Sequence, residues 1–261
     1  MLRVLTYNVH RWLGTDRRVS PERIAAVIAA CQPDVAALQE VRVGRTETGV
    51  GQLATVADAL GMTAHFHPTV QFGPERFGLA VLTALPSRVV RTGRLPGWPG
   101  GPPLEPRGAL WVAVEAGGAE VQVITTHLGL FGPERLAQAE ALVGPDWLGS
   151  PACREPAILA GDLNASFRSR PYKRLLTRLR DAQLGAPEAR PRATFHSRLP
   201  LARIDHLLVS RGIEVLATAP VRTALTRQAS DHLPLVADLN LPAANRADAL
   251  HGPDLASFRP V

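Results

Sequence analysis

Short apolar segments recur along the chain, and many of them are bounded by Gly, Pro, Asn or Asp. Segments of this length that are rich in Val, Ile and Leu are typical of strands buried in a sheet. We therefore predict eight strands: Arg3–Val9, Asp34–Glu40, Phe77–Leu82, Ala109–Glu115, Val121–Thr126, Pro156–Gly161, Ile204–Val209 and Leu235–Leu239.

Four other segments carry apolar residues at the spacing of a helix. The first has the clearest start, because Ser20 suits the capping position and Pro21 the first helical position. Some predicted strands are joined by a tight turn, as at Gly117 and Gly118, whereas others are separated by helices. This mixture predicts an α/β (α+β) protein with mixed sheets. The predicted helices are Pro21–Cys31, Gln52–Leu60, Pro133–Leu148 and Pro171–Leu179.

No long linker divides the chain, so we predict one catalytic domain over residues 1–241. The Gly/Pro-rich stretch 96–106 is expected to form a loop beside the site. Residues 242–261 lack a sustained apolar period and are expected to form a mobile or loosely docked tail.

Composition indicates an ordinary soluble protein of 261 residues with 46% hydrophobic residues and no apolar window long enough for a membrane span. The first predicted strand starts at residue 3, and Cys31 and Cys153 do not resemble a disulfide framework, so we expect a cytoplasmic monomer. The net charge of +6 favours an anionic partner. The excess is dispersed arginine, with Lys173 the one lysine, so charge alone does not identify that partner.

Polar residues directly follow or open apolar strands at six places, where a side chain is held rigidly and can face a cleft. Each motif alone is a weak signal, since such residues are usually solvated or cap an element. Together, and in this order along the chain, the six motifs are a strong signal. The motifs are Thr6-Tyr7-Asn8-Val9, Leu38-Gln39-Glu40-Val41, Thr125-Thr126-His127-Leu128, Gly161-Asp162-Leu163-Asn164, Arg203-Ile204-Asp205-His206 and Ser230-Asp231-His232-Leu233-Pro234.

This series of motifs resembles the endonuclease/exonuclease/phosphatase superfamily, which includes pancreatic-type deoxyribonuclease, abasic-site endonucleases, neutral sphingomyelinases and inositol polyphosphate 5-phosphatases. The resemblance extends over residues 2 to about 241. It implies a four-layer sandwich, in which two mixed β-sheets pack face to face and helices cover both outer faces. It also implies an active site at one edge of the sheets and a requirement for Mg²⁺, or Mn²⁺ as a substitute.

The candidate metal ligands have the donor atoms that a hard cation prefers. Asn8, Glu40 and Asp231 offer oxygen atoms, and the motifs hold no cysteine–histidine cluster of the kind that zinc prefers. We expect Glu40 to bind the metal directly. Asn8 and Asp231 bind it either directly or through water.

Hydrolysis of a phosphoester needs an activated water and donors that neutralise charge on the phosphoryl oxygens. By the resemblance, His232 with Asp205 as its partner is the general base or the group that stabilises the pentavalent state. Asp162 orients the attacking water or binds metal. Asn164 and His127 donate hydrogen bonds to phosphate oxygens.

Three further positions refine the prediction. His127 stands where abasic-site endonucleases carry a tyrosine-bearing motif, which favours the deoxyribonuclease, sphingomyelinase and phosphatase branches. Glu75 resembles a glutamate that orients this histidine in some relatives; the alternative is a surface ion pair with an arginine. Arg107 stands where relatives place a phosphate-contacting arginine; the alternative is an ion pair with Glu105. His206 is expected to be structural, because neighbouring strand residues point to opposite faces.

The sequence therefore predicts a Mg²⁺- or Mn²⁺-dependent hydrolase of a phosphoester, with a phosphodiester favoured. A nuclease acting on DNA or RNA and a hydrolase of phospholipid, sphingomyelin or inositol phosphates both stay open. A catalytically silent binding module is the least favoured, because such a relative would have lost at least one of the five central polar residues, and none is missing. Those residues are Glu40, Asp162, Asn164, Asp231 and His232.

Overall fold

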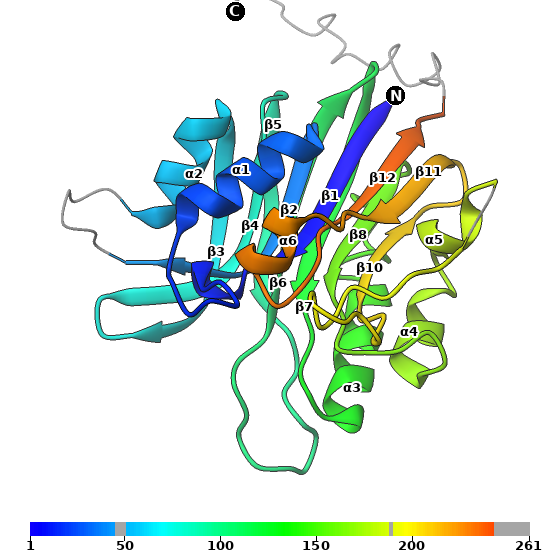
Figure 1. Cartoon of the computed structure of the whole chain (residues 1–261). Helices are drawn as coiled ribbons and strands as arrows, with labels where there is room; N and C mark the ends of the chain where they lie inside the picture. Colours follow the sequence, from blue (N-terminus) through cyan, green and yellow to red (C-terminus); the bar gives the residue numbers. More distant parts are fainter. Residues whose placement is uncertain (45–50, 188–189, 243–261) are drawn as a thin grey trace, which may run out of the picture.

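Two six-stranded sheets lie face to face in the computed structural model, and helices cover their outer faces (Figure 1). The structure describes residues 1–44, 51–187 and 190–242. The C-terminal tail expected from the sequence lies outside the described residues from position 243 onward.

The first sheet has the order β11-β12-β1-β2-β4-β3. Its β1 and β2 strands are parallel, and every other neighbouring pair in it is antiparallel. Helices α1 (Pro21–Cys31) and α2 (Gln52–Leu60) cover its outer face through a cluster of buried apolar side chains. The strands are β1 (Leu2–Asn8), β2 (Val35–Val43), β3 (Thr63–Phe72), β4 (Glu75–Thr83), β11 (Glu214–Pro220) and β12 (Leu235–Asn240).

The second sheet has the order β5-β6-β7-β8-β10-β9, with β7 and β8 as its parallel pair. Helices α3 (Gly132–Val143) and α4 (Arg170–Leu175) pack on its outer face over another cluster of buried apolar side chains. Three short elements complete the fold: η1 (His10–Trp12), α5 (Ala182–Gly185) and α6 (Ala224–Ala229). The strands are β5 (Ser87–Arg94), β6 (Gly108–Ala116), β7 (Ala119–His127), β8 (Ala157–Asp162), β9 (Arg180–Asp181) and β10 (Asp205–Val209).

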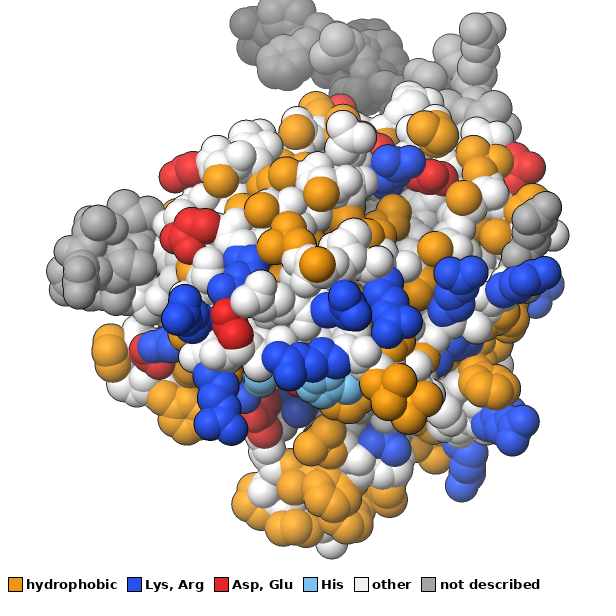
Figure 2. Space-filling model, in the orientation of Figure 1, with side chains coloured by type: hydrophobic (Ala, Val, Ile, Leu, Met, Phe, Trp, Pro, Cys, Tyr) orange, Lys and Arg blue, Asp and Glu red, His pale blue; other side chains and the backbone are white. Residues whose placement is uncertain are grey.

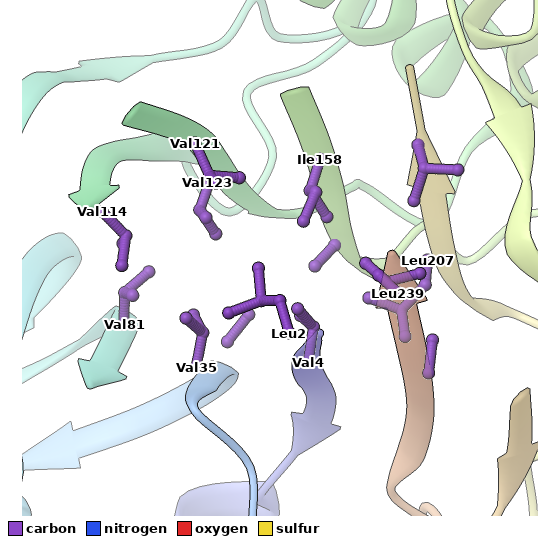
Figure 3. Packing of buried hydrophobic residues seen from close by; sticks show 14 of the residues in the cluster. Leu2, Val4, Val35, Val81, Val114, Val121, Val123, Ile158, Leu207 and Leu239 are labelled. Carbon is purple, nitrogen blue, oxygen red and sulfur yellow. The ribbon is translucent and has the colours of Figure 1, made fainter. Parts of the chain in front are cut away.

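The core of the molecule lies between the two sheets. Val4 and Val35 of the first sheet and Val123 and Ile158 of the second are fully buried there, and Figure 3 shows these side chains pointing toward one another. Each sheet thus buries both of its faces, one against its partner sheet and one under helices. The predicted four-layer α/β sandwich is confirmed.

The predicted strands and helices all appear, and the differences lie at the edges. Helix α3 ends at Val143 rather than at Leu148, because Gly144 leaves the helical conformation and Pro145 follows it. Helix α4 ends at Leu175 rather than at Leu179, and turns follow it. The two-residue strand β9 and strands β3, β5 and β11 were not predicted. The last three lie at the sheet edges with mostly exposed or half-exposed side chains, so they lack the apolar runs that mark a buried strand.

Residues 95–107 form the loop that the Gly/Pro-rich stretch predicts, and it extends from one end of the sandwich between β5 and β6 (Figure 1). Within the described part of the chain, no helix is long and apolar enough to span a membrane.

Candidate active site

The polar motifs meet at one edge of both sheets. The parallel strands β1 and β2 end at this edge, as do β7 and β8 of the other sheet, while the antiparallel strands β10 and β12 begin there. A cavity of about 560 Å³ opens at this edge. Its polar lining includes Glu40, Arg107, His127, Asp162, Asn164, Asp231 and His232.

His232 and Asp205 form a buried pair at the base of the cavity. His232 Nδ1 donates to Asp205 Oδ2 at 2.8 Å, and the hydroxyl of Thr194 donates to the same carboxylate oxygen. Burial disfavours a charged imidazole, yet the carboxylates of Asp205, Asp162 and Asp231 outweigh it and raise the pKa of His232 to about 10. The histidine is therefore a cation at neutral pH.

Asp162 lies at the centre of the site and is almost fully buried. Its carboxylate accepts hydrogen bonds from the backbone N–H of Asn164 at 2.8 Å and from the side-chain amide of Asn8 at 3.1 Å. Asp162 Oδ2 also lies 3.7 Å from His232 Nε2. Burial, together with the negative charge of Asp205, raises the pKa of the Asp162 carboxyl above its ordinary value. Such a carboxylate accepts a proton more readily than an exposed one.

His127 is a neutral histidine with a nitrogen donor close to each of its ring nitrogens. Burial first, and then the positive charges of Arg107 and His232, hold its pKa well below the ordinary value. Arg107 Nη1 lies 3.1 Å from His127 Nδ1, and the side-chain nitrogen of Asn164 lies 3.0 Å from Nε2. A guanidinium and an amide nitrogen both only donate, so the ring nitrogen without the proton accepts from its neighbour. Nε2 also lies 3.5 Å from Asp162 Oδ2.

Two further carboxylates face the cavity. Glu40 Oε1 accepts from the side-chain amide of Asn8 at 3.1 Å, so Asn8 joins it to Asp162. The side chains of Glu40 and Asp231 are 26% and 24% exposed. Glu40 Oε2 lies 3.5 Å from Arg11 Nε, and Asp231 Oδ1 lies 3.5 Å from a ring nitrogen of His10.

Two groups of residues have the donors for a metal ion. Asp162, Asp205 and His232 each offer one ligand atom, and these atoms lie within 4.8 Å of one another. In this group, however, Asp205 and His232 are hydrogen-bonded to each other through Oδ2 and Nδ1. Glu40 offers its oxygens from a more accessible place, beside the buried Asp162.

Comparison with known proteins identifies the family. A family model described as the Endonuclease/Exonuclease/phosphatase family matches residues 5–232. The chain belongs to this family. A search of curated proteins found no match.

Solved structures share the fold. An endonuclease/exonuclease/phosphatase from Beutenbergia cavernae is 26% identical, with a TM-score of 0.73 over 92% of this chain and 72% of that chain. A mannosyl-6-phosphatase of Bacteroides thetaiotaomicron is 20% identical, with a TM-score of 0.72 over 92% and 100% of the two chains. The human Nocturnin catalytic domain with bound sulfate is 21% identical, with a TM-score of 0.69 over 92% and 93%.

This member of the endonuclease/exonuclease/phosphatase family brings together all but one of the site residues proposed from its sequence. The exception is Glu75, which pairs with Arg42 on β2. The ring nitrogens of His127 face Arg107 and Asn164 instead, so the expected orientation of His127 by Glu75 is corrected to the alternative surface ion pair. Arg107 does pair with Glu105, at 3.1 Å, and at the same time lines the cavity.

Sequence reasoning missed four residues around the site. Thr194 supports Asp205, and the ring of Phe195 lies 4.8 Å from that of His232. Both come from a segment without regular structure, so no period marked them. His10 and Arg11 directly follow the Asn8 motif, and that proximity was the available signal. His206 is buried against Asp181 and the Ala165 carbonyl, as expected of a structural residue.

Proposed function

We propose that this protein is a Mg²⁺- or Mn²⁺-dependent hydrolase that cleaves a phosphodiester by attack of an activated water. One observation carries the proposal: a buried, charged His232–Asp205 pair lies beside Asp162 at the base of a cavity that also presents Glu40 and Asp231. This arrangement offers a cation for the phosphoryl group, a proton acceptor for water, and oxygen ligands for a hard metal.

The residues present fit a divalent cation. Glu40 and Asp231 are half-buried carboxylates that line the cavity, and the side-chain amide of Asn8 donates to both Glu40 and Asp162. Glu40 and Asp231 would therefore hold the ion directly or through water, and Asn8 would join them through Oδ1, which also accepts from the backbone N–H of His10. A bound metal supplies positive charge that polarises the phosphoryl oxygens and makes water more acidic.

Each of the remaining side chains has a separate chemical role. Asp162, whose pKa is raised, accepts the proton of the attacking water. His232 stays protonated, and its Nε2–H stabilises the negative charge that grows on the phosphoryl group. Asp205 holds that imidazolium in place through Nδ1. The general-base role for His232 is thereby the less favoured of the two roles that the sequence left open.

Three donors suit the phosphoryl oxygens. Arg107 is 11% exposed and borders the cavity, His127 Nε2 lies 3.5 Å from Asp162 Oδ2, and the amide of Asn164 donates to the Leu128 carbonyl at 2.9 Å. Apolar side chains line other parts of the wall and leave room for an organic group on the far side of the phosphate, which suits a diester. They include Val70, Phe72, Phe77, Leu130 and Phe195.

A panel of substrates tests the proposal. Purified protein with Mg²⁺ or Mn²⁺ should hydrolyse bis-p-nitrophenyl phosphate, and EDTA should abolish the activity until excess metal restores it. His232→Ala should lower the rate by about 10²-fold, the scale of a lost acid–base or charge-stabilising group. Plasmid DNA, RNA, phospholipids, sphingomyelin and inositol phosphates complete the panel. The absence of metal-dependent turnover on every phosphoester would contradict the proposal and favour a silent binding module.

A further inference from the structure

The loop between β5 and β6 is apolar throughout its first ten residues. Positions 95–104 read Leu-Pro-Gly-Trp-Pro-Gly-Gly-Pro-Pro-Leu and hold no polar side chain. Four of the prolines, at 96, 99, 102 and 103, are exposed. Apart from the indole N–H of Trp98, this segment offers water no hydrogen-bonding side chain, and together with its apolar neighbours it points to an apolar partner.

Neighbouring side chains extend this apolar surface. The ring of Trp98 stacks on that of Phe131, with centroids 5.3 Å apart and planes 20° apart. Phe131 is 45% exposed and Leu130 is 65% exposed. Leu104 lines one hollow together with Leu130 and Phe131. We name residues 96–104, Leu130 and Phe131 the apolar rim.

The apolar rim borders the mouth of the active site. Leu130 lines the catalytic cavity, and Arg107 follows the loop three residues after Leu104. Arg107 also lines the hollow beneath Leu104 and Phe131. Whatever covers the rim therefore lies next to the residues proposed to bind the phosphoryl group.

Cationic side chains flank the same entrance. Arg11 lines the cavity and is 57% exposed. Outside the cavity lining, Arg198 and Arg222 are exposed, and within the described residues they donate to neutral oxygens of Thr15 and of the Arg198 backbone. Figure 2 shows hydrophobic side chains gathered at the lower end of this face, with Lys and Arg side chains above them around the pale-blue histidines.

An apolar tip bordered by arginines complements a surface that is apolar inside and anionic outside. A lipid bilayer has this profile, because its acyl chains lie beneath phosphate headgroups. Nucleic acid matches the charge, but the two rings of the rim, Trp98 and Phe131, already stack on each other, and the leucines, prolines and glycines around them offer no ring on which a base could stack. A second protein copy would match the apolar part but not the arginines.

We propose that the apolar rim inserts into an anionic phospholipid bilayer and that the substrate is a phospholipid, whose headgroup phosphodiester enters the cavity beside Arg107. The second part of this inference, the phospholipid substrate, rests on the proposed hydrolase function. Insertion itself is independent of catalysis and is measured separately.

Tryptophan fluorescence reports the insertion directly. Trp12, Trp111 and Trp147 are at most 3% exposed, whereas Trp98 is only half-buried, so a change in emission on adding vesicles comes from Trp98. Vesicles with an anionic phosphatidylglycerol fraction should shift the emission to shorter wavelength, and brominated acyl chains should quench it. Vesicles that leave both signals unchanged would overturn the proposal.

A double variant tests the surface by co-sedimentation with the same vesicles. Trp98→Ser with Phe131→Ser removes both stacked rings and should reduce vesicle binding by about tenfold or more, since bilayer affinity scales with the apolar area buried. Leu184→Ser on α5 is the matched control, because Leu184 is 56% exposed but lies outside the rim, and it should bind like the wild type.

The outcomes separate this inference from the proposed function. Turnover of bis-p-nitrophenyl phosphate should be the same in the double variant and the wild type, because neither ring lines the catalytic cavity. Hydrolysis of vesicle phospholipid should fall with vesicle binding. Equal vesicle binding by both proteins would refute bilayer insertion while leaving a soluble phosphodiesterase intact. A dimer in solution that the double variant dissociates and that does not bind vesicles would do the same. Vesicle binding without any turnover would refute the function and keep the surface.

Discussion

Replacement of Asp205 by asparagine isolates the role of charge in the His232–Asp205 pair. Asparagine keeps the shape of the side chain and an oxygen that can accept from His232 Nδ1, but it removes the negative charge. Asp205 is fully buried, so no solvent screens that charge. The variant therefore changes the electrostatics of the site while its hydrogen-bond pattern persists.

The size of the effect follows from the contact. A hydrogen bond to a charged group contributes about 1.5–3 kcal/mol and a neutral one about 0.5–1.5 kcal/mol, so the variant loses about 1–2 kcal/mol. If this difference is expressed in the transition state, kcat falls by about 5- to 30-fold. Because burial lowers the pKa of His232 and Asp205 opposes it, the pKa must fall in the variant from about 10.

The pH dependence of stability and turnover tests whether His232 is charged. The pKa of His232 is raised in the folded protein, so its contribution to stability is complete below the ordinary histidine pKa and is lost as the pH rises through about 10. In Asp205→Asn this loss, and the alkaline limb of the kcat profile, should both move to lower pH. An alkaline limb that stays in place would show that His232 does not act as a cation.

A buried histidine–aspartate pair outside the cavity provides the control. His206 Nδ1 lies 3.5 Å from Asp181 Oδ2, and Asp181 also accepts from Tyr172 and Arg203. Asp181→Asn should lower the thermal midpoint, because it removes the charge that pairs with the buried Arg203. It should leave the kcat profile unmoved, since Asp181 does not line the cavity.

Three further predictions concern metal, phosphate and backbone. Glu40→Gln should weaken Mg²⁺ binding in calorimetry while the free energy of unfolding without metal stays unchanged within about 0.5 kcal/mol; equal affinity would remove Glu40 from the metal ligands. Arg107→Ala should lower kcat/KM by about 10- to 150-fold, the scale of a charged hydrogen bond, whereas Arg88→Ala in a surface ion pair should not. Glu40→Gly should be more stable in urea than Glu40→Ala by about 0.5–1 kcal/mol, because Glu40 has φ 53° and glycine relieves that strain; the reverse order would contradict this backbone conformation.

Much of the fold was predictable because buried strands leave a strong signal. β1, β6, β7 and β8 are almost wholly buried, and their apolar runs mark them in the sequence. The edge strand β3 contains Pro68 and has a mostly half-exposed pattern, so nothing distinguishes it from a loop. Pairing across the sheets is a tertiary property and leaves no periodic pattern at all.

The candidate site was predictable in its residues but not in its contacts. β1 and β8 belong to different sheets but end at the same edge of the sandwich, which explains why Asn8 and Asp162 meet although they are distant in sequence. The error at Glu75 has a different cause. Its motif allowed either a histidine or an arginine as partner, and only the structure shows that Arg42 is the neighbour. A short motif therefore fixes the strand position of a residue and not the group that it pairs with.

The side-chain motifs in the sequence do not reveal the backbone strain at the site. Glu40 has φ 53°, Asn164 has φ 46°, and His10 and Arg11 have φ 44° and 57°. A residue other than glycine in this region costs about 1–3 kcal/mol, and the rest of the fold must overcome that cost. At Glu40 the pairing register of β2 with β4 shifts between Leu38 and Val41, so the strained residue leaves the ladder and its carboxylate faces the cavity. Glycine would relieve the strain but has no carboxylate to bind a metal. The glutamate at this strained position therefore indicates that placing a carboxylate at the cavity matters more there than the stability of the fold.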